Sequence, residues 1–240
     1  MRGMEGKRVL VTGASGGIGR CVVDRLRRHG AAVGGADIVV PSDQQLEVAV
    51  RVDVTDEESV AEAVAAVRSA LGGIDALVAT AGIEVSGPTH ELAVADFRRV
   101  IEVSAVGTFL AARAVLPCML EAGGGEIVTF GSTAAVVAAP ELAAYAAAKG
   151  AVLQFTRSIA AEYARRGIRA NCICPGGTMT PMLAAIDRER TAPDHFRERH
   201  PIGRYAEPEE IASAVTFLLS EESSFVLGAA LMVDGGYTCM

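Results

Sequence analysis

The stretch Lys7-Arg-Val-Leu-Val-Thr-Gly-Ala-Ser-Gly-Gly-Ile-Gly19 decides the expected fold of this chain. Residues 7–12 are rich in Val and Leu and predict a buried strand, and the helical period of 17–29 predicts a helix directly after it. Glycines fill the turn between them, where they allow a sharp bend and leave backbone amides free at the positive end of the helix. A tight turn that binds nothing needs the same glycines, but the strand and helix on either side favour a pyrophosphate site.

Short apolar runs alternate with longer segments of helical period along the rest of the 240 residues. This alternation is typical of a parallel sheet that is covered by helices on both faces. We therefore predict an α/β fold, a doubly wound parallel sheet in a single domain over 1–240. Further strands are expected at 33–36, 48–52, 76–80, 126–130, 168–174 and 230–233, and further helices at 56–71, 96–120, 143–166 and 208–219.

The charge and composition of the chain exclude several classes of partner. The formal net charge is −7 and 50% of the residues are hydrophobic, so a broad cationic surface for nucleic acid or acidic lipid is not expected. The strand at 7–12 leaves no room for a signal peptide, and apolar stretches such as 134–139 are too short to span a bilayer. We expect a soluble, cytoplasmic protein with no nucleic-acid or membrane partner.

One irregular segment, 178–207, is charged and interrupted by three prolines. Its centre, Thr191-Ala-Pro-Asp-His195, is typical of a mobile lid, so substrate choice is expected to depend on this segment. The four histidines lack neighbouring Cys or carboxylate residues at metal-ligand spacing, and we expect no metal site. They are interpreted as surface or lid residues: His29, His90, His195 and His200.

A carboxylate is expected to bind the second half of the cofactor. Asp37 comes 18 residues after Gly19, at the end of the second predicted strand, where it can accept hydrogen bonds from both ribose hydroxyls. It would repel a 2′-phosphate, and neither Gly16 nor Ile38 supplies a compensating cation, so NAD is favoured over NADP. Asp53, after the third strand, either contacts the adenine or is an ordinary polar residue at a strand end.

Tyr145 and Lys149 are four residues apart, which puts both side chains on one face of a predicted helix. Lowering a phenol pKa from about 10 to about 7 takes about 4 kcal/mol, and one ammonium at about 4 Å supplies roughly that amount at an effective dielectric of about 20. Tyr145 is therefore predicted to act as a general base in alcohol oxidation and as a general acid in the reverse reaction. Ser132, at the end of a strand, would hold the substrate oxygen. The alternative is an unremarkable pair on a surface helix.

In combination, these segments resemble the short-chain dehydrogenase/reductase family over essentially the whole chain. Within that family, Gly82-Ile-Glu84 and Asn171-Cys-Ile-Cys-Pro-Gly176 are similar to the dihydroanticapsin dehydrogenase subfamily. The family resemblance rests, in order along the chain, on Thr12-Gly-x-x-x-Gly-x-Gly19, Asp53-Val54, Ala81-Gly82, Ser132, Tyr145-x-x-x-Lys149, Pro175-Gly-Gly-Thr-Met-Thr180 and Val233-Asp-Gly-Gly236.

The resemblance implies a Rossmann fold, a homotetramer or dimer, and catalysis by Ser132, Tyr145 and Lys149. It also implies that Lys149 holds the nicotinamide ribose and that Thr178 and Thr180 contact the nicotinamide end. The full set of positions expected to contact NAD is Gly13, Ser15, Gly17, Ile18, Gly19, Asp37, Asp53, Val54, Ala81, Gly82, Tyr145, Lys149, Pro175, Gly176, Thr178 and Thr180.

Two positions depart from the pattern of the family. Thr80 stands where an Asn usually braces the central sheet, and we expect its hydroxyl to replace part of that bonding. Ser104 stands where the family has a catalytic Asn that supports a water in the proton path to the lysine. A serine can still bond a water, so Ser104 is assigned to the catalytic set with a slowed proton relay. Glu84, after the fourth strand, either reaches the rim of the site or is exposed.

Two functions follow as alternatives. The first is an NAD-dependent oxidoreductase that acts on a secondary alcohol or its ketone. The second is a cofactor-binding regulator or scaffold whose catalysis is impaired by Thr80 and Ser104. The intact set of Ser132, Tyr145 and Lys149 favours the enzyme.

Overall fold

The computed structural model describes residues 1–41, 46–184 and 195–240. In this part of the chain, seven strands form one parallel sheet in the order β3-β2-β1-β4-β5-β6-β7, which confirms the predicted fold class. The strands are β1 (Arg8–Thr12), β2 (Ala32–Asp37), β3 (Val48–Arg51), β4 (Ala76–Ala79), β5 (Gly125–Phe130), β6 (Ile168–Pro175) and β7 (Ala230–Val233).

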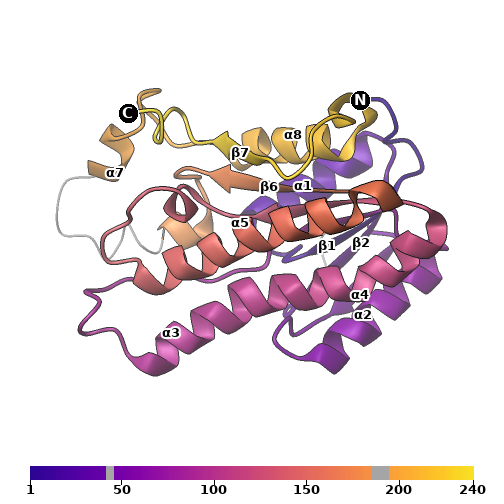
Figure 1. Ribbon diagram of the computed structural model, residues 1–240, viewed down its shortest axis with the longest axis horizontal. Coiled ribbons are helices and arrows are strands. Elements are labelled where there is room, and N and C mark those ends of the chain that lie inside the picture. The colour runs from indigo at the N-terminus through magenta and orange to yellow at the C-terminus, as the bar shows by residue number, and fades with distance from the viewer. Residues whose placement is uncertain (42–45, 185–194) are drawn as a thin grey trace.

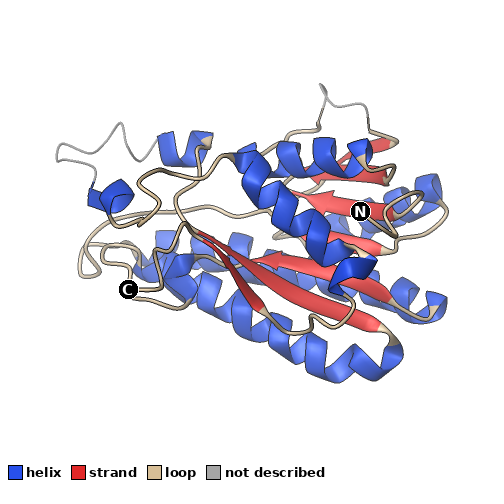
Figure 2. Cartoon of the chain, turned by 90° about the horizontal axis from the view of Figure 1, so that it is seen from above, coloured by secondary structure: helices blue, strands red, loops and turns tan. Residues whose placement is uncertain are grey.

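Helices cover both faces of this sheet (Figures 1 and 2). On one face, α1 (Gly17–Arg28) and α8 (Pro208–Leu219) bury an apolar layer against the central strands. On the other face, α2 (Glu57–Leu71), α4 (Gly107–Ala122) and α5 (Ala143–Tyr163) bury a second layer. Strands β1, β4 and β5 contribute side chains to both layers, which explains why their sequences read as continuous apolar runs.

The helix predicted at 96–120 begins earlier and is not uniform. It runs from α3 (Val94–Ile101) through a π-helical turn at Glu102–Val106 into α4. The extra residue of a π turn rotates the side chains that follow it, and such turns are frequent at functional sites. Ser104 lies within this turn and is fully buried.

Val94–Ala122 is also the one stretch of the described chain that is long and apolar enough to cross a membrane. Half of its most apolar window is buried inside the protein. The helix packs on the sheet and on its neighbours α2 and α5, which makes it a core helix of a soluble fold.

Local sequence signals set the ends of α2 and α8. Asp56 caps α2 by accepting hydrogen bonds from the backbone of Glu58 and Ser59, and Gly72 ends it in the left-handed conformation. Pro208 begins α8, and Glu207 and Glu210 form a capping box across its first turn.

The ends of the predicted lid are joined to each other. Thr178 pairs with Ala206 in a single parallel bridge, supported by hydrogen bonds from the amide of Met179 to Ala206 and from the amide of Ala206 to Gly177. A short helix, α7 (His195–Glu198), precedes the second of these ends. Residues 185–194, which include most of the Thr191–His195 centre, lie outside the described residues, and the lid stays a prediction.

Candidate active site

The glycine turn, Asp37, Ser132 and the 175–180 segment all follow the carboxyl ends of strands in the parallel sheet. In open α/β sheets this edge is where ligands bind. The structure therefore brings the predicted catalytic and cofactor positions to one side of the molecule, although they come from segments far apart in the chain.

The glycine turn is too tight for side chains at its key positions. A methyl group on Gly19 would overlap the carbonyl oxygen of Gly13, and one on Gly13 would lie 2.5 Å from the Thr80 hydroxyl. Gly16 precedes α1 with an extended backbone, and no side chain caps the first turn of that helix. Uncapped amides at a helix N-terminus form a site for an anion such as a pyrophosphate.

Asp37 lies beside this turn. Its carboxylate accepts hydrogen bonds from the amide of Ser15, at 2.9 Å, and from the amide of Val39, at 3.3 Å. Across the β2–β3 pair, Arg51 stands in register with Asp37 and is exposed. The residues next to the glycine turn and Asp37 in the sequence do not reveal this cation, because register between strands is a tertiary property.

Asp53 has local hydrogen-bond partners. One carboxylate oxygen accepts from the amide of Thr55, at 3.0 Å, and from its hydroxyl, at 2.7 Å, and these bonds lower the pKa of Asp53. The geometry is that of an Asx turn at a strand end, so it explains Asp53 without a ligand. Contact with an adenine stays a prediction.

Tyr145 and Lys149 share one face of α5, as predicted. The Lys149 ammonium lies 5.5 Å from the centroid of the Tyr145 ring and donates a hydrogen bond of 2.9 Å to the carbonyl oxygen of Phe130. Ser132 follows β5 at the same edge, and its oxygen accepts from the amide of Ala134 at 3.2 Å. Lys149 is almost completely buried, which excludes the interpretation of the pair as part of a surface helix.

The electrostatics differ from the sequence-based expectation. Burial raises the pKa of Tyr145 well above its ordinary value, the charge of Glu84 raises it further, and the Ser132 hydroxyl lowers it. Burial also lowers the pKa of Lys149 to about 8. Desolvation is the largest cause of both shifts, so burial, and not the ammonium, sets the direction in which the phenol pKa moves in this structure.

Ser104 and Thr80, the two departures from the family pattern, have clear bonding roles. The Ser104 hydroxyl accepts from the amide of Ile83 at 3.3 Å and donates to its carbonyl oxygen at 3.4 Å. A methyl group on Gly82 would lie 3.4 Å from that hydroxyl and 3.3 Å from the Lys149 ammonium, so Ser104 and Lys149 border the same space. Thr80 donates to the carbonyl oxygens of Thr12 and Gly13, at 2.7 and 3.2 Å, and so braces β1 against β4.

Glu84 is the functional residue that the sequence left undecided. It is half-buried, and its charge raises the pKa values of both Tyr145 and Lys149. Its neighbours Ile83 and Val85 pack with Tyr145 against the buried face of α5. Glu84 therefore belongs to the rim of the site rather than to open solvent. The loop after β4 has no periodicity, so no sequence signal could show this.

We predict that Glu84→Gln lowers the pKa values of Tyr145 and Lys149, because the change removes a negative charge that favours their protonated forms. The pH-rate profile for alcohol oxidation should shift toward lower pH by less than about one unit, since one charge at a hydrated rim contributes on the order of 1 kcal/mol. Glu91→Gln makes the same change of net charge at an exposed residue and should leave the profile in place. Equal shifts in both variants, or a shift to higher pH, would contradict the role of Glu84.

The remaining predicted cofactor positions also lie at this edge of the sheet. The carbonyl of Gly176 accepts from the Thr178 hydroxyl at 3.1 Å, and a methyl group on Gly17 would lie 3.0 Å from the Thr180 side chain. The 175–180 segment thus contacts the glycine turn. The other positions line or support the same edge: Ile18 and Ala81 are half-buried, and Val54 and Pro175 are buried.

His200 lies in the segment predicted as a lid, but it is not a surface residue. Only 2% of it is exposed, because aromatic rings from three segments surround it. Among the described residues, no group of three His, Cys, Asp or Glu side chains is placed to hold a metal ion.

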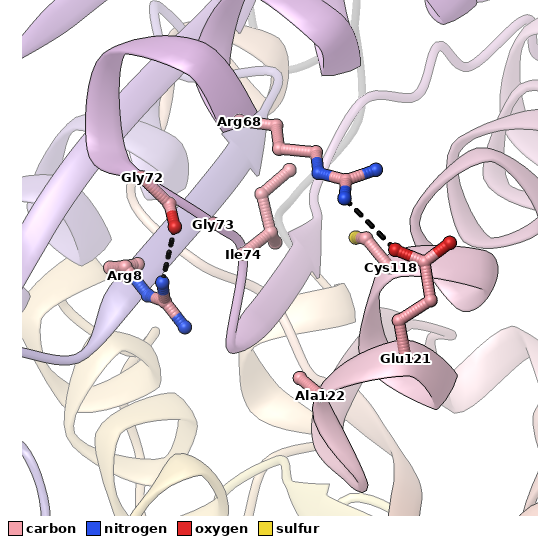
Figure 3. Close-up of a pocket in the computed structure, with 8 residues that line it drawn as sticks. All are labelled: Arg8, Arg68, Gly72, Gly73, Ile74, Cys118, Glu121 and Ala122. Atoms are coloured by element: carbon pink, nitrogen blue, oxygen red, sulfur yellow. Dashed lines mark hydrogen bonds and ion pairs between the residues drawn. The ribbon is translucent and has the colours of Figure 1, made fainter.

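A cavity of about 220 Å³ lies at the opposite end of the sheet (Figure 3). Its lining comes from the start of β1, the last turn of α2, the segment before β4 and the end of α4. Arg8 in its wall is already bound to Asp75 and to the carbonyl of Gly72, and Arg68 pairs with Glu121. The cavity is separate from the catalytic edge and contains no free cation among the residues that line it.

The chain is similar to known proteins over nearly its whole length. Residues 13–238 match a family model described as enoyl-(acyl carrier protein) reductase. The chain is 42% identical to cis-4-hydroxycyclohexanecarboxylate dehydrogenase from Sinomonas cyclohexanicum over 96% of each protein. It is 39% identical to 2,5-dichloro-2,5-cyclohexadiene-1,4-diol dehydrogenase from Sphingobium indicum over 100% of each.

A solved structure, that of levodione reductase, is 34% identical and superposes with a TM-score of 0.92, covering 98% of each chain. These relatives are named for dehydrogenation or reduction of small molecules. The order of the motifs along the chain, their meeting at the carboxyl edge of the sheet and the full-length similarity agree, and the chain belongs to the short-chain dehydrogenase/reductase family.

Proposed function

We propose that this protein is an NAD-dependent oxidoreductase that interconverts a ring-borne secondary alcohol and its ketone, with Tyr145 as the acid/base. The observation that carries the proposal is the meeting of Ser132, Tyr145 and Lys149 beside an uncapped glycine turn. Cyclic substrates are proposed because the names of two of the relatives specify a cyclohexane or cyclohexadiene alcohol.

The residues present fit a nicotinamide dinucleotide. The free amides at the start of α1 suit the pyrophosphate, Asp37 suits the adenosine ribose, and the buried Lys149 suits the hydroxyls of the second ribose. When bound, the nicotinamide supplies or accepts the hydride. Everything else in the reaction falls to side chains of the protein.

Tyr145 transfers the proton. Because burial raises its pKa, the phenol is protonated near neutral pH and is ready to donate to a ketone oxygen as the alcohol forms. In the oxidation direction the phenolate must form first, so the rate of oxidation should rise with pH. Ser132 donates to the same substrate oxygen and orients it, and Lys149 stabilises the phenolate by its charge.

A screen of cyclohexanols and cyclohexanones with NAD and NADP, followed by absorbance of the reduced cofactor, tests the reaction. Turnover that depends on Tyr145 supports the enzyme. Cofactor binding without turnover on any substrate class would favour the alternative, a regulator or scaffold. That alternative was motivated by two departures from the family pattern, Thr80 and Ser104. Because Thr80 braces the sheet through its own hydrogen bonds, only Ser104 still favours it.

We predict that Ser104→Asn increases kcat, because the longer amide can bond Ile83 and still reach a water near Lys149. An increase of a few-fold is expected, within the range of about 10²-fold that a proton-transfer aid supplies. The measurement is kcat at saturating cofactor. A fall in kcat at unchanged thermal stability would show that the serine is the better residue in this site.

Cofactor preference is predicted to depend on the balance between Asp37 and Arg51. Asp37→Asn keeps an acceptor for the Ser15 amide but removes the charge, so the affinity for NADPH relative to NADH should rise about tenfold, or about 1.4 kcal/mol. Asp24→Asn, an exposed residue of α1, is the control of equal charge. Fluorescence titration with each reduced cofactor has no contribution from tryptophan, because the chain contains none. A preference of the unmodified protein for NADPH, lost in Arg51→Gln, would overturn the NAD assignment.

A homotetramer or dimer is proposed from family membership, and sedimentation of the purified protein tests it. Cytoplasmic location is proposed from the acidic, soluble character of the chain.

A further inference from the structure

His200 makes two hydrogen bonds that define its protonation state. Its Nε2 accepts from the amide of Gly177 at 3.0 Å, and its Nδ1 lies 2.8 Å from the carbonyl oxygen of Phe196. A carbonyl oxygen only accepts, so Nδ1 carries the hydrogen, and Nε2 must be unprotonated to accept. The ring is therefore neutral and held in one tautomer.

Aromatic rings fix the position of this imidazole. The ring centroids of Phe196 and Tyr237 lie 5.0 Å from that of His200, and the centroid of Tyr205 lies 5.7 Å away. These residues come from α7, from the segment before α8 and from the C-terminal segment after β7. A methyl group on Gly177 would overlap the Tyr205 ring, so the backbone of Gly177 packs tightly against this aromatic cluster.

The segment that His200 holds reaches the glycine turn. The segment 176–181 contains Gly177 near its start and Thr180 and Pro181 at its end. A methyl group on Gly17 would lie 3.0 Å from Thr180 and 3.0 Å from Pro181. The carbonyl of Gly177 is also bonded to the amide of Ala206. A shift at Gly177 is therefore passed along a few residues of constrained backbone to the start of α1.

We propose that His200 is a positioning residue: its neutral imidazole fixes residues 176–181 against the glycine turn and so sets the affinity for the dinucleotide. The proposal rests on the proposed function, since it assigns the dinucleotide to that turn. His200 touches neither substrate nor cofactor and acts through Gly177. His200 itself is not a member of the catalytic set of Ser132, Tyr145 and Lys149.

Two amide substitutions separate the two hydrogen bonds of the imidazole. His200→Gln places an amide oxygen near the position of Nε2 and keeps an acceptor for Gly177. His200→Asn places an amide nitrogen near Nδ1, keeps the donor to Phe196 and leaves the Gly177 amide without its partner. His90→Gln and His90→Asn, at an exposed histidine, are the matched controls.

The readout is the dissociation constant of NADH, together with KM for NAD and kcat. His200→Asn is expected to weaken NADH binding by about tenfold, because a buried N–H is left unpaired, and to raise KM for NAD more than it lowers kcat. His200→Gln should restore most of the affinity, and the controls should bind as the unmodified protein does. Equal losses in the Gln and Asn variants, or no loss in either, would overturn the proposal.

Two measurements keep the proposal testable if a variant does not fold or if NADH does not bind. Nitrogen-15 NMR of the histidines in the unmodified protein should show His200 as the neutral Nδ1–H tautomer, and an Nε2–H tautomer or an imidazolium at pH 7.5 would overturn the assignment. Hydrogen exchange of peptide 176–181 should be faster in His200→Asn than in His200→Gln. Failure of the unmodified protein to bind either reduced cofactor would contradict the proposed function, and the exchange result would then decide the role of His200 by itself.

Discussion

Replacing Tyr145 with Phe is expected to lower kcat for ketone reduction by about 10²- to 10⁴-fold, the range that positioned proton transfer contributes. The change removes one hydroxyl and leaves the ring that packs against Val100, Ala144 and Ala148. The affinity for NADH should fall far less than kcat, because most of the assigned cofactor contacts, at the glycine turn, Asp37 and Lys149, do not use the Tyr145 hydroxyl. Steady-state kinetics and NADH titration on the same preparation measure both quantities.

Tyr163→Phe is the matched control for this experiment. Tyr163 ends the same helix, α5, and its hydroxyl is engaged by Glu162 rather than by the site. This variant should retain full kcat. Turnover that survives in Tyr145→Phe would remove Tyr145 from the mechanism, and loss of NADH affinity together with turnover would point to a structural effect in place of a lost proton donor.

Gly19→Ala is expected to damage both stability and cofactor binding. The added methyl group would overlap the carbonyl oxygen of Gly13 and lie 2.9 Å from its carbonyl carbon, and both atoms are backbone, so no side-chain rotation relieves the contact. Overpacking of this kind typically costs about 1–3 kcal/mol, which corresponds to a fall of several degrees in Tm for a chain of this length. NADH affinity should fall by about tenfold or more, since about 1.4 kcal/mol of distortion at the site is a factor of ten.

Gly150→Ala tests whether this effect belongs to the turn or to any glycine in a helix. Gly150 lies in α5, and a methyl group there would meet nothing within 4 Å. Its replacement should raise stability by about 0.5–1 kcal/mol, because alanine loses less backbone entropy on folding. Thermal unfolding and NADH titration of the two variants side by side give the comparison. A Gly19→Ala protein with unchanged Tm and affinity would show that the turn opens without cost.

The sequence alone was sufficient to predict the sheet, the helices around it and the grouping of the main site residues. Strand and helix periods are local, and each strand found in the structure matches a predicted one within a few residues. Parallel strands bring their carboxyl ends to one edge, so the glycine turn, Asp37 and Ser132 were bound to meet there. A four-residue spacing places Tyr145 and Lys149 on one helix face wherever the helix lies.

Only the tertiary structure decided the electrostatics of that site and the surroundings of the residues that support it. The direction of the Tyr145 pKa shift follows from burial and from Glu84, which reaches the site from a loop with no periodic signal. Arg51 approaches Asp37 through strand register, and His200 is enclosed by rings from three separate segments. Burial and charge–charge distance depend on residues far apart in the chain, whereas periodicity and turn chemistry depend on neighbours, and this is why the sequence determined the scaffold and the fold determined the pKa values.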